Sequence, residues 1–335
     1  MRFSDVLDIR NGRNQRQVEN ENGKYPIYGS GGVIGHADNF ICDAETVVIG
    51  RKGSINNPIF VDEPFWNVDT AFGLVANKEV LLPKYLYYFC VNYNFEQLNT
   101  TVTIPSLTKA NLLQIEIRVP DMDIQQNIVN VLDKICYLID VRRKELYSLD
   151  QLVKSRFIEL FGDPVSNSYG LPEATLSDLG EFGRGVSKHR PRNDIKLLGG
   201  KYPLIQTGDV ANAGLYITSY GNTYSELGLR QSKMWDKGTL CITIAANIAK
   251  TAILEFDACF PDSVVGFIAN ERTNNIFIHY WFSFFQEILE SQAPESAQKN
   301  INLKILSELK VIVPEKRKQD EFASFVKLTN KSKTV

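Results

Sequence analysis

The residues best suited to chemistry are cations in a segment interrupted by glycine and proline. This segment, RGVSKHRPRND, begins at Arg184. Its glycine and proline predict a loop, from which several cations can reach phosphate oxygens while an arginine offers its forked guanidinium to guanine. The alternative is a solvated basic surface loop. The candidate residues are Arg184, Lys188, His189, Arg190 and Arg192.

Smaller groups of polar residues elsewhere have the same chemical potential. Arg10, Arg13 and Arg16 lie near the start of the chain and could contact phosphate or base edges. In the stretch GRKGS, Gly50 and Gly53 would let the backbone approach a phosphate closely. The remaining candidates from this stretch and from matching turns later in the chain are Arg51, Lys52, Ser54, Gln206, Thr207, Asn247 and Lys250.

Patterns that would indicate catalysis are incomplete. The stretch 57–60, NPIF, resembles the Asn-Pro-Pro-Phe/Tyr motif with which amino-methyltransferases hold a target base, but it lacks the second proline and no glycine-rich cofactor loop precedes it. Asp62, Glu63 and Asp69 are acidic neighbours, yet the later half of the chain has no matching cluster of acids and lysine. We therefore predict no catalytic residue in this chain, and read these acids as solvated loop charge.

Cysteine and histidine usage does not suggest a metal site. The chain has five cysteines and three histidines, scattered without the close spacing of zinc ligands or of a disulfide framework. We expect reduced, mostly buried thiols, no bound metal and no cofactor.

Composition favours a soluble, cytoplasmic protein of two domains. The chain has 335 residues, 44% of them hydrophobic, and contains neither a signal-peptide pattern nor an apolar run that could span a membrane. Its net charge of -2 argues mildly against DNA binding, because phosphate neutralisation supplies much of the affinity. The objection weakens if cations cluster on one face or if a partner supplies phosphate contacts.

The same series of motifs occurs twice in the same order. FSDVLDIRNG corresponds to LSDLGEFGRG, GKYPIYGSGG to GKYPLIQTGDV, and FGLVANKE to VGFIANER. Matched motifs in conserved order indicate an internal duplication. The second copy is longer mainly between its GKYP motif and Thr239, which suggests a variable loop on a shared scaffold.

Each copy is predicted to be a compact α+β domain. Short β-branched runs such as 46–49 and 252–254 are bounded by glycine, asparagine and proline, as strands are. Segments 84–89 and 277–282 favour buried helices, whose dense aromatic residues we assign to the core rather than to base stacking.

A long helix is predicted between the copies, from Asp121 to Phe161. It would be about 60 Å long at 1.5 Å per residue. Its apolar residues recur at spacings of three and four, as in a coiled-coil seam, and such a stripe needs a partner. A shorter helix after Pro314 would pair with it antiparallel, covering the half near Phe157 and leaving the other half for another chain. The seam residues are Ile128, Val131, Ile135, Leu138, Leu146, Leu149, Val153, Phe157, Phe322 and Phe325.

Two globular halves, each ending in a Val-Pro step and followed by a helix containing glutamine, resemble the specificity subunits of type I restriction-modification systems. The resemblance spans essentially the whole chain and is strongest in SRFIELFGDP, RGVSKHRPRND and KYPLIQTGDV. It implies two target-recognition domains, 1–120 and 171–313, joined by a central helix, 121–162, that pairs with a distal helix, 314–335. The distal helix is shorter than the family pattern.

The resemblance also implies a function and a set of partners. Each domain would read one part of a split sequence in double-stranded DNA, and the chain itself would have no active site. Two modification subunits would methylate adenine with S-adenosylmethionine, and a restriction subunit would cut DNA with ATP and Mg. Self-association through the exposed helix is a further expectation. The alternative is a spare or decoy subunit that acts mainly as a scaffold for modification subunits.

Overall fold

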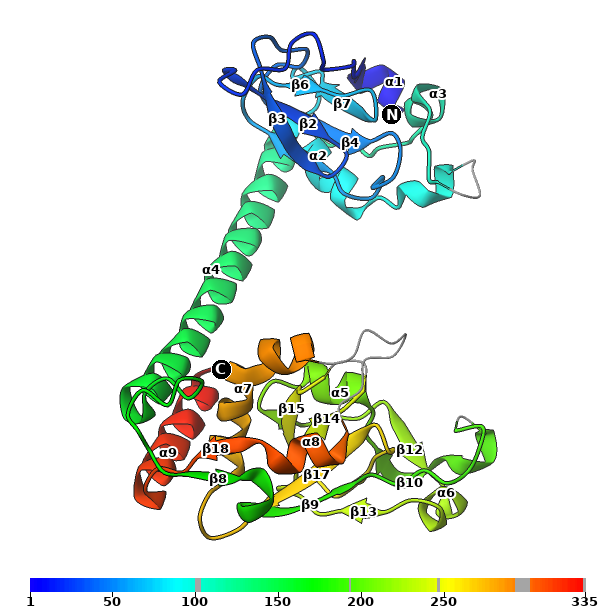
Figure 1. Ribbon diagram of the computed structural model, residues 1–335. Helices are drawn as coiled ribbons and strands as arrows, with labels where there is room; N and C mark the ends of the chain where they lie inside the picture. Colours follow the sequence, from blue (N-terminus) through cyan, green and yellow to red (C-terminus); the bar gives the residue numbers. More distant parts are fainter. Residues whose placement is uncertain (100–103, 193, 246–247, 293–301, 334–335) are drawn as a thin grey trace. The chain divides into compact units, whose positions relative to one another are not determined.

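The computed structural model describes the chain in five stretches, residues 1–99, 104–192, 194–245, 248–292 and 302–333. The chain divides into two compact units, unit 1 from Met1 to Arg143 and unit 2 from Lys144 to Val335. One long helix, α4 (Met122–Phe161), contributes residues to both units (Figure 1). Within the described stretches, no helix is both long and apolar enough to cross a membrane.

Unit 1 contains two β-sheets. Its strands are β1 (Leu7–Asn11), β2 (Tyr25–Gly29), β3 (Gly32–Ala37), β4 (Thr46–Gly50), β5 (Ile59–Val61), β6 (Trp66–Asn67) and β7 (Ala71–Ala76). The first sheet has the antiparallel order β1-β7-β4-β5. The second has the order β3-β2-β6, in which β2 runs antiparallel to β3 and parallel to β6. Strand β4 is buried at every position, which explains its uninterrupted β-branched sequence.

Unit 2 repeats this arrangement with additions. Its strands are β8 (Glu173–Thr175), β9 (Gly180–Arg184), β10 (Leu198–Leu204), β11 (Tyr216–Ile217), β12 (Asn222–Tyr224), β13 (Met234–Trp235), β14 (Leu240–Thr243), β15 (Thr251–Leu254), β16 (Ala258–Cys259), β17 (Val264–Ala269) and β18 (Lys310–Ile312). The order β9-β17-β14-β15 matches β1-β7-β4-β5, and β12-β10-β16 matches β3-β2-β6. In the second match, β10 runs parallel to β16 as β2 runs parallel to β6. The duplication predicted from sequence is therefore a structural repeat.

Some of the helices also correspond between the units. Those of unit 1 are α1 (Phe3–Val6), α2 (Pro83–Asn92) and α3 (Lys109–Leu113), and those of unit 2 are α5 (Thr207–Asn212), α6 (Glu226–Arg230), α7 (Asn275–Gln292), α8 (Leu303–Glu308) and α9 (Lys316–Lys333). Helices α2 and α7 confirm the two predicted buried helices. Helix α2 begins with Pro83 in its first turn, where the missing N–H costs nothing.

The extra length of the second copy is folded, which corrects the prediction of a variable loop. Helices α5 and α6 and strands β11 and β13 all lie in it, along with β12, the counterpart of β3. Strand β11 lengthens one sheet by pairing parallel to β15, and β13 lengthens the other by pairing with β16. The insertion therefore widens both sheets of unit 2.

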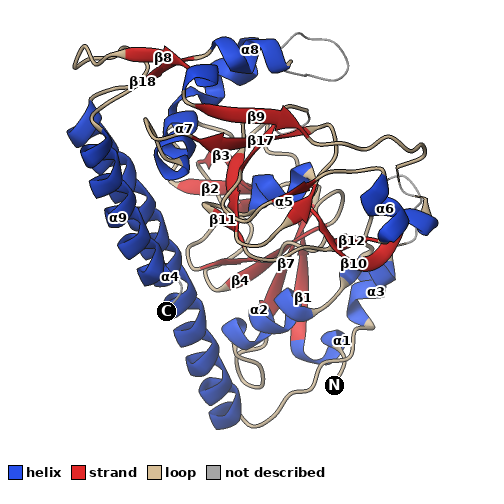
Figure 2. Ribbon diagram, turned by 90° about the horizontal axis from the view of Figure 1, so that it is seen from below, coloured by secondary structure: helices blue, strands red, loops and turns tan. Residues whose placement is uncertain are grey.

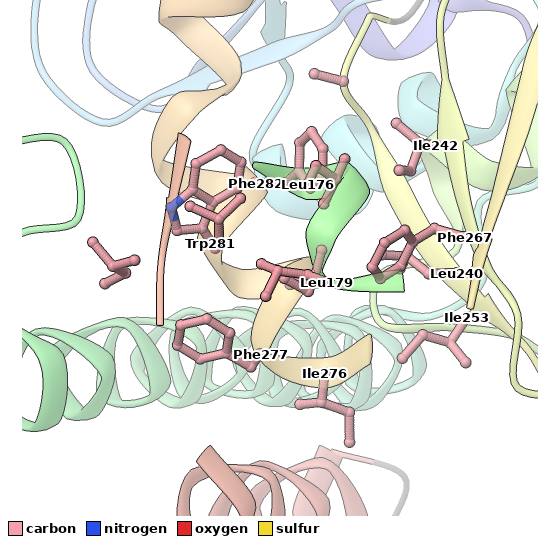
Figure 3. Packing of buried hydrophobic residues seen from close by; sticks show 14 of the residues in the cluster. Leu176, Leu179, Leu240, Ile242, Ile253, Phe267, Ile276, Phe277, Trp281 and Phe282 are labelled. Atoms are coloured by element: carbon pink, nitrogen blue, oxygen red, sulfur yellow. The ribbon is translucent and has the colours of Figure 1, made fainter. Parts of the chain in front are cut away.

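Aromatic residues fill the core of unit 2, as predicted. Figure 3 shows Phe277 and Trp281 of α7 beside Leu179, and Phe267 beside Leu240. All five side chains are fully buried. A smaller core in unit 1 gathers around Phe3, Phe72 and Leu74. Each unit thus has its own hydrophobic core.

The start of α4 is fixed to unit 1 by the buried side chain of Gln125. Its amide oxygen accepts a hydrogen bond from the Leu82 N–H at 2.9 Å. Its amide nitrogen donates to the carbonyl oxygens of Val80 and Pro120, both at 2.8 Å. One side chain thus satisfies backbone groups of two separate segments at the point where the helix begins.

Gln319 does the same for α9 in unit 2. Its amide nitrogen donates to the carbonyl oxygens of Arg272, at 3.0 Å, and Pro314, at 2.8 Å. Its amide oxygen accepts from the Thr273 hydroxyl at 2.9 Å. Gln125 and Gln319 each follow the proline of a Val-Pro step by five residues, so the structural repeat includes the start of both helices.

Helix α9 lies antiparallel beside the end of α4 (Figure 2). Arg156 of α4 contacts Glu321 of α9, and Asp150 contacts Lys333, so residue numbers fall along one helix as they rise along the other. The rings of Phe157 and Phe322 lie 5.4 Å apart, edge to face. Of the predicted seam, Val153, Phe157 and Phe322 are buried, while Leu146, Leu149 and Phe325 are partly buried.

The earlier half of the α4 seam is exposed to solvent, as predicted. The exposed fractions are 37% for Ile128, 59% for Val131, 47% for Ile135 and 54% for Leu138. Val129, which the predicted seam missed, is only 3% exposed.

Replacing Phe157 with alanine should destabilise unit 2. The ring is fully buried against Phe161, Phe277 and Phe322, so we expect a loss of about 3–5 kcal/mol of unfolding free energy, typical of a buried phenylalanine. Urea unfolding followed by tryptophan fluorescence measures this loss, because two of the three tryptophans, Trp235 and Trp281, belong to unit 2 and Trp66 alone belongs to unit 1.

The matched control is Leu152→Ala on the same helix. Leu152 is 49% exposed, and we expect a change within about 0.5 kcal/mol. Equal losses for the two variants would contradict the helix packing described above.

Candidate nucleic-acid interface

The basic segment of unit 2 leaves the sheet at the end of β9. Arg184 is the last residue of that strand, which corrects its assignment to a loop. The next residue is Gly185, where the chain passes very close to the backbone at Phe260. A Cβ on residue 185 would lie 2.2 Å from the Phe260 carbonyl oxygen. The segment is then held by Ser232, whose hydroxyl donates to the Val186 carbonyl at 2.7 Å. It is thus anchored at its start.

Two carboxylates organise the cations of this segment. Asp262 contacts the guanidinium groups of both Arg192 and Arg190, the latter at 3.5 Å. Asp194 lies 3.0 Å from Nε2 of His189. The backbone N–H of Lys196, and then the His189 ring, hold the pKa of Asp194 below its usual range. This pattern favours an ordered basic surface over independently moving cations.

The other two cations of the segment have no such carboxylate. Arg184 and Lys188 are exposed, and neither forms an ion pair with another residue in the described part of the chain. Their charge is therefore directly available to an anion such as phosphate.

A pocket of about 400 Å³ brings three predicted residues together. Arg192, Gln206 and Thr207 line it, although Arg192 follows β9 and the other two lie at the start of α5, Gln206 directly before its first residue, Thr207. Gln206 precedes the first turn of α5, and its backbone N–H donates to Asp209 at 2.7 Å. The remaining lining residues are Ser187, Leu198, Leu204, Asn222, Tyr224, Pro261 and Ser263. Apolar walls with amide and guanidinium groups suit a flat polar ligand such as a base.

Lys250 lies in a different hollow of unit 2. This groove, of about 830 Å³, is lined by residues of α4, α5, α7 and α9. The Lys250 ammonium donates to the Gln286 side-chain oxygen at 3.0 Å. Lys250 thus lines a different hollow from Gln206 and Thr207, and Asn247 lies outside the described residues.

His279 also lines the groove that contains Lys250. Its Nδ1 lies 2.9 Å from the Thr251 hydroxyl. Burial, with a smaller contribution from the charge of Lys333, lowers the pKa of His279 to about 4. The imidazole is therefore neutral at pH 7.

In unit 1 the predicted cations are spread along one strand and the loop after it. Arg10 lies on β1, and its Nε is 3.0 Å from Asp8. The exposed Arg13 and Arg16 follow the strand. The Trp66 indole N–H donates to the Arg13 carbonyl at 3.0 Å, which fixes the backbone while leaving the side chain at the surface.

The GRKGS stretch forms a turn after β4. Arg51 lies over the ring of Phe72, 5.7 Å from its centre. Lys52 and Ser54 are exposed, and Gly53 has a φ of +82°, a conformation that glycine adopts easily. The turn is held by the Gly53 N–H, which donates to the Pro105 carbonyl at 3.1 Å. Its cations therefore sit on a fixed backbone.

Two residues important to this geometry were not predicted. Asp262 organises the arginines, and the hydroxyl of Ser187, 7% exposed, lines the pocket without a hydrogen-bond partner in the described structure. The sequence signal for Asp262 was the repeat, because Asp69 also lies two residues before the equivalent strand, β7.

The described residues contain no cluster of three or more histidine, cysteine or acidic side chains that could hold a metal. All five cysteines are free thiols, of which only Cys136 is exposed. Burial raises the pKa of the Cys42 thiol to about 12, so this cysteine is not an activated nucleophile.

A protein-family model supplies the decisive comparison. The model, described as Type I restriction modification DNA specificity domain, matches residues 1–151 and 172–333. The chain belongs to this family. The two matches fall on the two structural repeats, so the family domain occurs once in each.

Individual relatives agree with this membership. A Haemophilus influenzae protein named as a type I restriction enzyme specificity subunit is 24% identical over 323 residues, covering 92% of this chain and 82% of the relative. The specificity subunit named for MjaX of Methanocaldococcus jannaschii is 21% identical over 76% of this chain and 63% of its own length. The crystal structure of a type I restriction-modification S subunit from M. genitalium shares the fold, with a TM-score of 0.66, 19% identity, and coverage of 100% of this chain and 89% of that one.

The neutral His279 should make unit 2 less stable in acid. Its pKa is about 4 in the folded chain against an ordinary value of 6.5, so the unfolded chain binds the extra proton between these values. The unfolding free energy of unit 2 that depends on His279 has its full value above pH 6.5 and falls as the pH drops towards 4. Urea unfolding between pH 4 and 7 should show this fall, and His279→Gln should flatten it.

His36→Gln is the control for this experiment, since His36 is an exposed histidine of unit 1. It should leave the pH profile of unit 2 unchanged. An identical slope for wild type and His279→Gln would show that His279 is not responsible.

Proposed function

We propose that this chain is the non-catalytic DNA-reading subunit of a type I restriction-modification complex. The observation that carries the proposal is the coincidence of the family match with two repeated units, each with cations beyond its first sheet strand. Two such units suit a split target in double-stranded DNA, one part read by each. The target-recognition domains are 1–120 and 171–313, with 121–162 as spacer helix and 314–335 as distal helix.

Catalysis in this proposal belongs to partner subunits. Two modification subunits methylate adenine and bind S-adenosylmethionine, while a restriction subunit cuts DNA and uses ATP and Mg. The present chain contributes the choice of sequence. Its net charge of -2 is compatible with this role because the cations are concentrated locally, as in Arg184, Lys188, Arg190 and Arg192.

The DNA contacts proposed for unit 2 divide into two kinds. Arg184 and Lys188, for which no carboxylate partner occurs among the described residues, contact phosphates and position the duplex. Arg192, Gln206 and Thr207, which share a pocket, read base edges. In unit 1 the proposed contacts are Arg10, Arg13, Arg16, Arg51, Lys52 and Ser54.

The exposed stripe of α4 is the proposed docking face for a modification subunit. Four apolar residues, from Ile128 to Leu138, lie on one side of the helix and are 37–59% exposed. Covering them with a second protein would remove apolar surface from water. A second copy of this chain is the competing occupant.

Sequence selection can be tested by mapping methylated adenine in cells that express this chain with its modification subunit. We expect a split motif in which one part changes when residues 171–313 are exchanged for those of another family member. A continuous motif would overturn the division of labour between the units.

Two further outcomes of the mapping separate the rival functions. Absence of methylation, with the modification subunit still bound, would favour the scaffold or decoy alternative. Methyl transfer by the purified chain alone would contradict its assignment as a non-catalytic subunit.

Docking can be tested with Leu138→Glu. Placing a carboxylate in the stripe should weaken binding of the modification subunit by about tenfold or more, which corresponds to about 1.4 kcal/mol. The control is Tyr137→Glu, since at 3.6 residues per turn Tyr137 faces away from the stripe and is 67% exposed. Titration calorimetry measures both affinities.

The docking proposal fails if the two variants weaken binding equally or not at all. Sedimentation of the chain alone separates the competing occupant: a dimer broken by Leu138→Glu but not by Tyr137→Glu would indicate self-association.

A further inference from the structure

The pocket beside Arg192 has an unused polar group at its wall. The Ser187 hydroxyl is buried, lines the pocket, and has no hydrogen-bond partner in the described structure. Buried hydroxyls in folded proteins nearly always have a partner, so an orphan of this kind points to a ligand or a water that completes it. Asn222 and Gln206 add amide groups around the same space.

Asp262 contacts Arg192 beside that pocket. It lies between Pro261 and Ser263, both of which line the pocket, and it contacts Arg192 and Arg190 at once. The side chains are partly exposed, at 46% for Arg192, 56% for Arg190 and 35% for Asp262. A DNA duplex can therefore reach all three.

The carboxylate changes which ligand the arginines favour. A phosphate approaching Arg192 is repelled by the nearby negative charge of Asp262, whereas the acceptors of a neutral base, which carry only partial charge, are repelled much less. Asp262 also restricts the guanidinium to fewer orientations, which lowers the entropy cost of a directed contact. The first effect weakens binding to DNA irrespective of its sequence. The second favours a directed contact with one chosen base.

We propose that Asp262 is a specificity-determining residue that positions Arg192 at the pocket for a guanine base and discourages phosphate. Guanine presents two acceptors, N7 and O6, to a guanidinium fork in the major groove. Asp262 acts through Arg192 and does not itself contact the base. The proposal rests on the proposed DNA-reading function and adds how unit 2 distinguishes a base from the phosphate backbone of DNA.

The repeat supplies a matched control. Asp69 occupies in unit 1 the position of Asp262 in unit 2, two residues before β7 and β17 respectively. No ion pair of Asp69 occurs among the residues that the structure describes. Asp69→Asn thus removes the same charge from an equivalent place without releasing an arginine.

The experiment compares Asp262→Asn and Asp69→Asn in complex with the modification subunit. Affinities are measured at several salt concentrations for the target duplex and for a scrambled duplex. For Asp262→Asn we expect binding to the scrambled duplex to strengthen about threefold to tenfold and the salt slope to steepen by about one, because a freed arginine reaches a phosphate. Methylation mapping should show that only the part of the motif read by unit 2 becomes relaxed.

Two further variants test whether Asp262 works through Arg192. Asp262→Asn should have little effect on selectivity for the unit 2 part of the motif in an Arg192→Gln background, and Asp262→Glu, which keeps the carboxylate, should restore most of the selectivity. Thermal unfolding of each complex identifies variants that fail to fold. If Asp262→Asn fails to fold, Asp262→Glu carries the test. It should be at least as selective as Arg192→Gln and should keep the salt slope of the wild type.

The outcomes separate this proposal from the proposed function. Equal effects of Asp262→Asn and Asp69→Asn would overturn it, since net charge would then explain both. An unchanged effect of Asp262→Asn in the Arg192→Gln background would also overturn it. A wild-type complex that shows no preference for any duplex would instead mean that the DNA-reading function itself is wrong.

Discussion

Each long helix depends on one glutamine side chain that is buried where the helix begins. Gln125 and Gln319 bond mainly to backbone groups, and a buried group left without its partner would cost about 1–3 kcal/mol. A glutamine suits this place because its amide carries both a donor and an acceptor. The same interaction therefore joins a globular unit to a helix twice in one chain.

Much of the fold was predictable because duplication leaves matched motifs on equivalent strands. GKYP lies at β2 and β10, and the runs that begin at Thr46 and Thr239 lead into β4 and β14. The exposed and covered halves of α4 were also predictable from apolar spacing. The burial of Val129 was not, because periodicity predicts a stripe but does not reveal which surface lies beside the helix.

The candidate site was only partly predictable, because its geometry joins residues that are distant in sequence. Arg192 and Asp262 are 70 residues apart, and nothing near either one identifies the other. The additional elements of unit 2 were missed for a related reason. Strands β11 and β13 have two residues each, too few to show an alternating pattern, and they are stabilised by neighbours in the sheet.

The middle of α4 has a different physical character from its ends. None of the residues from Lys134 to Leu152 is buried, whereas Val129 and Val153 on either side are almost completely covered. An ordinary helix frays at its termini, where hydrogen bonds are lost first. Here both termini are clamped by packing, so the backbone amides of the central turns are the ones that should exchange with solvent deuterium most readily. The exposed stretch that these turns form includes Ile135 and Leu138, so a protein docked on the stripe would protect its first turns from exchange.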